Sequence, residues 1–116
     1  MRRGDVILTF VPNVGAPGGK LRPAVIVQTD QNNARLNETI IAAVTSNLLN
    51  VGQPHQFLIE LASVDGQATG LLHDSAVRCE RLHTIPQSEV RRTIGRLSPV
   101  LTQELDRCLK ASLGIP

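Results

Sequence analysis

The stretch Lys20-Leu21-Arg22-Pro23-Ala24-Val25-Ile26-Val27-Gln28 decides the fold. Its unbroken run of small and β-branched apolar residues predicts a strand over 23–28 that is central in a sheet and buried on both faces. Because Pro23 has no backbone N–H to give to a neighbouring strand, we expect it at the start of this strand. Arg22 then stands at the mouth of a buried strand, which makes it the first candidate for a functional residue.

Apolar runs on either side of this stretch predict further short strands. They cover residues 5–10, 39–46, 56–61 and 75–82, and the strand over 56–61 is expected to be half-exposed. The connections are expected to be a glycine- and proline-rich loop over 11–20 that is too long for a tight hairpin, a polar segment over 29–38, an irregular segment over 47–55 and a turn at Asp65-Gly66.

The C-terminal part of the chain predicts a closing helix. Ser98 can cap it, Pro99 suits its first position, and Gly114 can end it. The segment 87–97 has apolar residues at helical spacing but contains a glycine, so it fits either a helix or a sixth strand. Five to six mainly antiparallel strands and one C-terminal helix predict a small barrel, and the 116 residues form a single domain, 1–116.

Composition narrows the classes of function. Ten of the twelve cations are arginines, although the net charge is only +2, and guanidinium groups bind phosphate in a bidentate way. Phe10 and Phe57 are the only aromatic residues, which disfavours readers of single strands that stack bases on aromatic rings. We see no secretory signal and no apolar run long enough to span a membrane, and we therefore expect a cytoplasmic protein.

Metal and nucleophile motifs are missing. The three histidines, His55, His73 and His83, lack metal-ligand spacing, and Cys79 and Cys108 are interpreted as small buried hydrophobic residues, not as a disulfide or metal site. We expect no metal and no cofactor.

The remaining polar candidates are Arg22 and the pair Thr45-Ser46 at the end of the strand over 39–46. If the two strands are antiparallel neighbours, these ends meet at one edge of the sheet. A guanidinium facing two hydroxyls could hold a phosphodiester and stabilise charge that develops at phosphorus. The alternatives are that Arg22 pairs with Asp5, Asp30 or Asp74, and that the hydroxyls only satisfy backbone groups.

The order of these segments resembles the MazF/PemK family of toxin endoribonucleases. The matching segments are Arg3-Gly4-Asp5-Val6, the loop 15–19, Arg22 to Val27, Val44-Thr45-Ser46, Gly70 to Val77, Leu82 to Ile85 and Ile94 to Ser98. The resemblance implies an SH3-like barrel that acts as a homodimer and cleaves single-stranded mRNA at short recognition sequences without a metal ion. The products would be a 2′,3′-cyclic phosphate and a 5′-hydroxyl.

The resemblance also implies roles for particular residues. Arg22 and Thr45 correspond to the catalytic pair, with Ser46 as a helper. The RNA-binding or auxiliary candidates are Gly18, Gly19 and Lys20 in the first loop, together with His73, which stands where members of the family commonly carry a charged residue. Many relatives carry a polar Ser-Glu-Gln segment in this loop, where this chain has Ala16-Pro17-Gly18.

The implied partners are an RNA substrate and a cognate antitoxin protein whose acidic, partly disordered tail would enter the basic groove. Two other functions stay open: a barrel toxin of the same fold that binds DNA gyrase and cuts nothing, and a catalytically dead RNA-binding relative.

Overall fold

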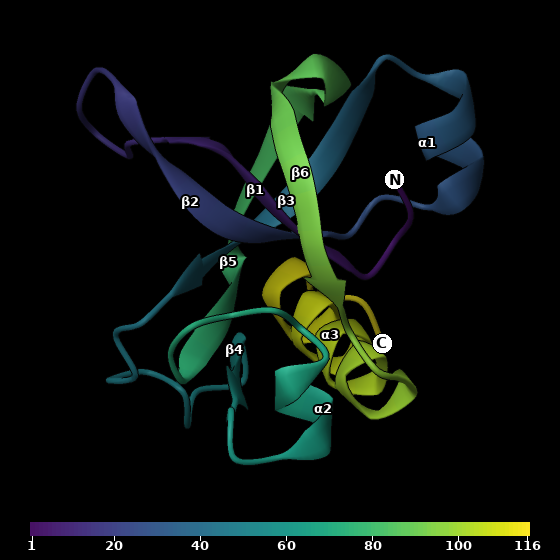
Figure 1. The fold of residues 1–116 in the computed structure, drawn as a ribbon. Helices are drawn as coiled ribbons and strands as arrows, with labels where there is room; N and C mark the ends of the chain where they lie inside the picture. The colour runs from purple at the N-terminus through teal and green to yellow at the C-terminus, as the bar shows by residue number, and fades with distance from the viewer.

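The computed structural model describes residues 1–116, which form one curled antiparallel sheet and three α-helices (Figure 1). The strands are β1 (Asp5–Pro12), β2 (Gly19–Ile26), β3 (Glu38–Thr45), β4 (Gln56–Ile59), β5 (Ser75–Pro86) and β6 (Val90–Arg96). The helices are α1 (Asp30–Arg35), α2 (Val64–Gln67) and α3 (Pro99–Leu113), and a 3-10 turn covers Gln87–Glu89. None of these helices has the length and apolar character needed to cross a membrane.

The spatial order of the strands is β4-β5-β3-β2-β1-β6, and all neighbours are antiparallel. The prediction of five to six mainly antiparallel strands in a small barrel with a C-terminal helix is therefore confirmed. The open choice over 87–97 is decided in favour of a strand, because β6 pairs with β1 along its length. The β1–β2 hairpin projects from the body of the molecule on the side opposite α1 (Figure 1).

Two hydrophobic clusters bury the two faces of the central strands. Val25 belongs to the cluster beneath α3, whereas its neighbours Ala24 and Ile26 belong to a smaller cluster on the other face. Successive strand residues point to opposite faces, so this division follows from the pleat. The prediction that this strand is central and buried on both faces is confirmed for 24–26.

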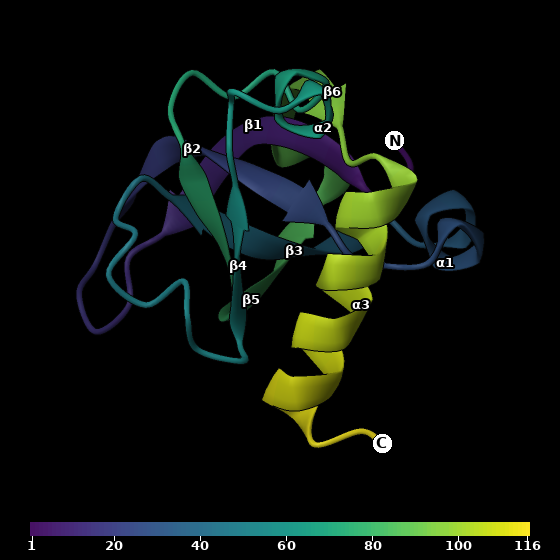
Figure 2. The same cartoon turned by 90° about the horizontal axis from the view of Figure 1, so that it is seen from below.

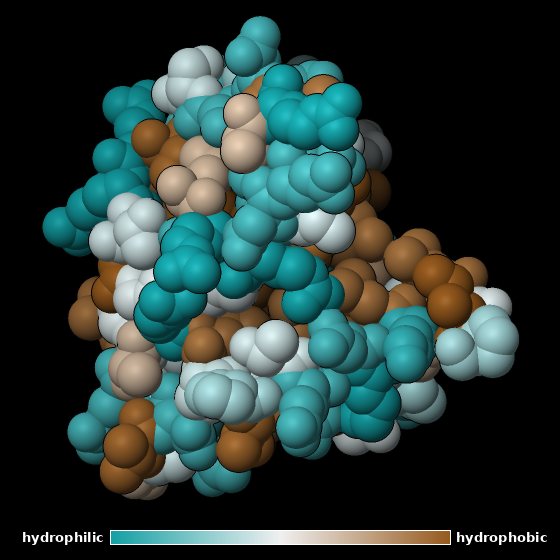
Figure 3. Space-filling view, turned by 90° about the vertical axis from the view of Figure 1, so that its right-hand side faces the viewer, coloured by the Kyte–Doolittle hydropathy of each residue, from teal (hydrophilic) through white to brown (hydrophobic).

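Helix α3 covers one face of the sheet and packs against β4 and β5 (Figure 2). Ser98 caps it by accepting a hydrogen bond from the backbone N–H of Leu101, and Gly114 ends it in the left-handed conformation at φ 68°. Cys79 of β5 and Cys108 of α3 are free and buried within the cluster beneath α3, as predicted. The side view in Figure 3 shows hydrophilic and hydrophobic side chains interspersed over this face, with a group of hydrophobic side chains on the projection at the right.

Pro23 is not at the start of its strand, contrary to the prediction, because β2 begins at Gly19 and Pro23 lies in its middle, opposite Leu8 of β1. The pairing of β2 with β3 begins only at Ala24. Pro23 therefore stands where one edge of β2 has no partner, and a strand tolerates proline there. The ladder between β1 and β2 extends as far as Pro12 and Gly19, so the loop of the hairpin is shorter than expected and covers 13–18.

Two local predictions about connections were wrong. The segment 29–38 contains α1, and the hydroxyl of Thr29 caps the first turn of this helix. The sequence did not indicate a helix here because the segment has no apolar stripe; its buried face is held by hydrogen bonds between polar side chains instead. Asp65 and Gly66 lie within the short helix α2, capped by Ser63, and not in an isolated turn.

Strand β4 ends at Ile59 and is mostly buried, contrary to the expected half-exposed strand over 56–61. The reason is that Gln56, polar in the sequence pattern, is only 2% exposed and donates a hydrogen bond to Glu80.

Candidate active site

Strands β2 and β3 bring Arg22, which lies within β2, and Thr45, the last residue of β3, to the same part of the sheet. Their register pairs Ala24 with Ala43 and Val25 with Ala42. Continuing this antiparallel register by two residues places Arg22 opposite Thr45, just beyond the last paired residues. Arg22 is thus not at a strand end, contrary to the prediction, because the pairing with β1 extends β2 back to Gly19. The antiparallel arrangement still brings Arg22 to the end of β3 that carries Thr45.

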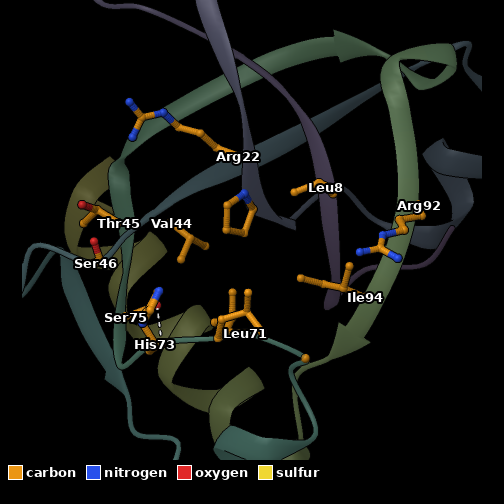
Figure 4. A pocket seen from close by; sticks show the side chains of 13 residues that line it. Leu8, Arg22, Val44, Thr45, Ser46, Leu71, His73, Ser75, Arg92 and Ile94 are labelled. Carbon is orange, nitrogen blue, oxygen red and sulfur yellow. Dashed lines mark hydrogen bonds between the residues drawn. The ribbon is translucent and has the colours of Figure 1, made fainter.

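A cavity of about 390 Å³, called here the main cavity, opens beside these two residues (Figure 4). Its lining residues are Leu8, Arg22, Pro23, Val44, Thr45, Ser46, Gly70, Leu71, Leu72, His73, Ser75, Arg92 and Ile94. Figure 4 shows the Arg22 side chain directed to the side where Thr45 and Ser46 lie, with Arg92 and Ile94 of β6 on the opposite wall. The main cavity is therefore largely apolar and has a cation on each side.

The floor of the main cavity is a row of side chains across three strands. The register pairs Pro23 of β2 with Leu8 of β1, and Leu8 with Arg92 of β6. Neighbouring strands lie about 4.8 Å apart, so this row spans roughly 10 Å from Pro23 to Arg92. A ligand in the cavity would contact an apolar surface between two arginines.

Arg22 is exposed and has no carboxylate within 4.0 Å. The three acids considered as its partners are used elsewhere. Asp5 accepts a hydrogen bond from the backbone of Arg2, Asp30 from that of Arg3, and Asp74 from that of Leu61. The guanidinium group of Arg22 is therefore available to an anionic ligand.

The hydroxyl oxygen of Thr45 accepts a hydrogen bond of 3.1 Å from the backbone N–H of Asn47. This is the backbone-satisfying contact that the sequence left open as an alternative. The contact uses the oxygen as an acceptor and leaves the O–H hydrogen able to donate to a ligand. Ser46, the next residue, is exposed on the rim of the main cavity.

The other auxiliary candidates fall into two groups. His73 is exposed and lines the main cavity, and its carbonyl accepts a hydrogen bond of 2.7 Å from the hydroxyl of Ser75. Gly18, Gly19 and Lys20 lie at the end of the β1–β2 hairpin and line neither this cavity nor the one described next. Their contact with RNA stays a prediction.

The two glycines have conformational reasons to be where they are. Gly18 has φ +82°, which residues with a side chain rarely adopt. A Cβ at Gly19 would overlap the carbonyl of Val11 and the ring of Phe10. The hairpin needs both glycines whether or not it touches a ligand.

A smaller cavity of about 140 Å³, called here the side cavity, lies next to the main cavity and shares Arg22, Val44 and Thr45 with it. Its other lining residues are Val11, Pro12, Asn13, Val14, Ala43, Arg78, Arg81 and His83. Three of its lining residues are arginines and none is acidic. Arg22 and Thr45 thus stand on the boundary between a mainly apolar cavity and a cationic one.

Two ionisable groups near the side cavity have shifted pKa values. The pKa of His83 lies below its ordinary value of 6.5 because of burial and the nearby charge of Arg81, so the ring is mostly neutral at pH 7. Burial alone would raise the pKa of Glu80, but hydrogen bonds from Gln56 and Arg78 outweigh it and keep the carboxylate ionised. No group of three or more His, Cys, Asp or Glu side chains is arranged to hold a metal ion.

Sequence reasoning missed most of the walls of the main cavity. Leu8 was assigned only to the strand over 5–10, and Arg92 and Ile94 lay in the segment that fitted either a helix or a strand. A usable signal was present: in a strand, Arg92 and Ile94 point to the same face because they are two residues apart. The choice of a strand for 90–96 would have placed both on one surface.

Comparison with known proteins gives one consistent result. Residues 2–113 match the family described as PemK-like, MazF-like toxin of type II toxin-antitoxin system. The chain is 30% identical to an endoribonuclease MazF of Staphylococcus saprophyticus, over 99% of this chain and 92% of that protein. It is 32% identical to a probable endoribonuclease MazF of Mycolicibacterium smegmatis, over 99% of this chain and 98% of that protein.

The fold is similar to that of a solved mycobacterial endoribonuclease in complex with its cognate antitoxin. The TM-score is 0.79 at 18% identity, and the match covers 100% of this chain and 97% of the other. At this identity the likeness speaks for the fold alone.

Proposed function

The chain belongs to the family of PemK-like and MazF-like toxins of type II toxin-antitoxin systems, and on this premise we propose that it is a sequence-selective endoribonuclease that cleaves single-stranded mRNA. The observation that carries the proposal is the position of Arg22 and Thr45. They lie on adjacent antiparallel strands, whose register, continued by two residues, sets them opposite each other. Both line the two cavities, and Arg22 has no carboxylate partner.

In the proposed reaction the 2′-hydroxyl of the substrate attacks the adjacent phosphorus. A bond forms between the 2′-oxygen and phosphorus, the bond from phosphorus to the 5′-oxygen breaks, and the 2′-hydroxyl loses a proton while the leaving oxygen gains one. The products are a 2′,3′-cyclic phosphate and a 5′-hydroxyl. The chemistry requires stabilisation of the negative charge that develops on the phosphoryl oxygens.

Arg22 is suited to that stabilisation because a guanidinium stays protonated and can donate two hydrogen bonds to one phosphate. For the same reason it does not serve as the proton acceptor. Thr45 can donate its hydroxyl hydrogen to a phosphoryl oxygen, since its own oxygen is held by the backbone N–H of Asn47. Ser46 can add a second hydroxyl from the same rim. We propose that this step needs no metal ion.

The test is cleavage of a long RNA by the purified protein in EDTA, with the 5′ ends sequenced and the 3′ ends identified by mass spectrometry. Removing one donor that stabilises the transition state typically costs about 10²–10³-fold in rate, and we expect Arg22→Ala to lose at least that much. Thr45→Val should lose activity and Thr45→Ser should keep part of it. Arg91→Ala is the matched control, because Arg91 is exposed and lines neither cavity.

Arg22→Ala should fold normally, because the Arg22 side chain makes no ion pair. Its unfolding free energy should stay within about 0.5 kcal/mol of wild type. Cleavage by Arg22→Ala at the wild-type rate would overturn the proposed site. A wild-type protein that binds RNA without cutting it would instead point to the catalytically dead relative.

We further propose that the protein acts in the cytoplasm as a homodimer and that a cognate antitoxin holds it inactive. A related endoribonuclease was solved with its antitoxin, which supports the last point. An acidic antitoxin segment would be attracted by the unpaired arginines around both cavities. Sedimentation equilibrium would test the dimer, and loss of cleavage on adding the antitoxin in equal amount would test the inhibition.

A further inference from the structure

The side cavity contains cations that the cleavage step itself does not use. Arg78 and Arg81 line it together with His83, on the far side of Arg22 from the main cavity. Arg78 is held by Glu80 at 3.3 Å, which offsets part of its charge. Arg81 is half-buried and has no carboxylate within 4.0 Å, so its charge faces the cavity uncompensated.

A bulge in β5 is what brings these two arginines to one cavity. The register pairs Ala42 with Leu82 but the next residue, Ala43, with Arg78, so residues 79–81 of β5 have no partner on β3. In a regular strand, residues 78 and 81 would point to opposite faces because they are three apart. Bulges often re-aim a side chain beside a functional site, and this one turns both guanidinium groups to the same side.

The side cavity also continues directly from the proposed catalytic residues. It shares Arg22 and Thr45 with the main cavity, so a ligand held at these two residues extends into one cavity in each direction. A single RNA strand presents a phosphate at every nucleotide, whereas the main cavity offers a mostly apolar surface. The unpaired guanidinium group of Arg81 on the cationic side matches the next phosphate along the strand.

We propose that the side cavity is a second phosphate subsite, in which Arg81, assisted by Arg78, binds the phosphate of the nucleotide adjacent to the scissile one. The inference rests on the proposed endoribonuclease function and deepens it. It assigns Arg81 to substrate binding and not to catalysis, because the residue lies one phosphate away from the reacting atoms.

The first test is the salt dependence of Arg81→Gln. The contact forms in the ground state and in the transition state alike, so we expect KM to rise about tenfold with kcat nearly unchanged. The slope of log KM against log salt should fall by about 0.7, the contribution of one phosphate contact on a single strand. Arg91→Gln makes the same change of charge away from both cavities and should leave KM and slope unaltered.

The second test locates the contact on the substrate. Two oligonucleotides, each with a single ribonucleotide at the cleavage site, carry a neutral methylphosphonate in place of the phosphate on one side or the other of the scissile bond. For wild type, one of the two should show a KM raised about tenfold. For Arg81→Gln the same substitution should add little, because the partner of the phosphate is already absent.

Arg81→Lys keeps the charge without the guanidinium fork and should retain most of the salt slope. This variant controls for misfolding of Arg81→Gln, and the circular dichroism spectra of both variants can be compared with that of the wild type. The measurements belong at about pH 8, where His83 is neutral.

The outcomes distinguish a failure of the proposed function from a failure of the proposed subsite. No cleavage by the wild-type protein would overturn the proposed function and this inference with it. Normal cleavage with an unchanged KM and salt slope in Arg81→Gln would overturn the subsite alone. Weaker antitoxin binding by Arg81→Gln with unchanged RNA cleavage would also overturn it and assign the side cavity to the protein partner.

Discussion

The sharpest prediction about stability concerns Asn33, a buried residue in helix α1. Its side-chain oxygen accepts hydrogen bonds from the Gln28 amide at 2.9 Å and from the Thr39 hydroxyl at 2.7 Å, and its amide donates to the carbonyl of Gln28 at 3.1 Å. These contacts fix α1 to the ends of β2 and β3. We expect Asn33→Ala to loosen this corner of the molecule.

The size of the stability loss in Asn33→Ala follows from the buried groups that lose a hydrogen-bond partner. The Thr39 hydroxyl is 0% exposed and donates to no other residue, and the Gln28 carbonyl loses its side-chain donor. The Gln28 amide keeps its bond to the carbonyl of Glu38. Two buried polar groups left without partners cost about 1–3 kcal/mol each, and the better helix propensity of alanine returns up to about 0.7 kcal/mol. We expect a net loss of about 3 kcal/mol.

Urea denaturation followed by circular dichroism measures this loss. All variants are compared at one protein concentration, because the transition of the proposed dimer would depend on concentration. A loss of this size would also lower Tm by about 10 °C in a domain of this length. Asn32→Ala is the control, because Asn32 lies in the same helix, is exposed and makes no side-chain hydrogen bond. It should change stability by less than about 0.5 kcal/mol.

A double variant tests the assigned mechanism. Asn33→Ala combined with Thr39→Val removes the hydroxyl that the single change leaves unpaired, so the double variant should be at least about 1 kcal/mol more stable than the sum of the single effects. Strict additivity, or a loss for Asn33→Ala no larger than that of Asn32→Ala, would refute the reasoning.

Two further predictions concern the core. Gly95→Ala should destabilise the protein by about 1–3 kcal/mol, because its Cβ would overlap the backbone of Ala68 and Thr69, whereas Gly52→Ala, with open space around it, should be neutral in the same urea assay. Burial raises the pKa of the Cys79 thiol to about 12, so its reactive thiolate is scarce below that pH. At about pH 8.5, N-ethylmaleimide should therefore modify the native protein at least about a hundredfold more slowly than the unfolded protein, as followed by mass spectrometry. Fast labelling of the native protein would contradict this prediction.

Local sequence chemistry was enough to predict most of the elements. The apolar runs predicted the strands, and Ser98, Pro99 and Gly114 predicted both ends of α3, because capping depends only on neighbours along the chain. Predictions of local structure failed where contacts with distant segments determined the conformation of a residue. Pro23 sits inside β2 because the neighbour β3 is missing there.

The candidate site, too, was predicted in part from the sequence and determined in part by tertiary structure. The sequence predicted that Arg22 and Thr45 lie on neighbouring antiparallel strands. It did not predict that Arg22 lies within its strand, because the pairing with β1 extends β2 back to Gly19. The structure places Arg22 and Thr45 at the meeting point of the two cavities. Gly18, Gly19 and Lys20 lie in the hairpin and line neither cavity.

The sequence by itself determined an aliphatic, arginine-rich domain whose strand after Arg22 must be buried on both faces, because composition and periodicity are properties of the chain alone. Tertiary structure decided what surrounds Arg22. The row from Pro23 through Leu8 to Arg92 depends on the register of three strands, and the shared direction of Arg78 and Arg81 depends on a bulge in β5. Register and bulges arise from pairing between distant segments, so no local pattern in the sequence specifies them.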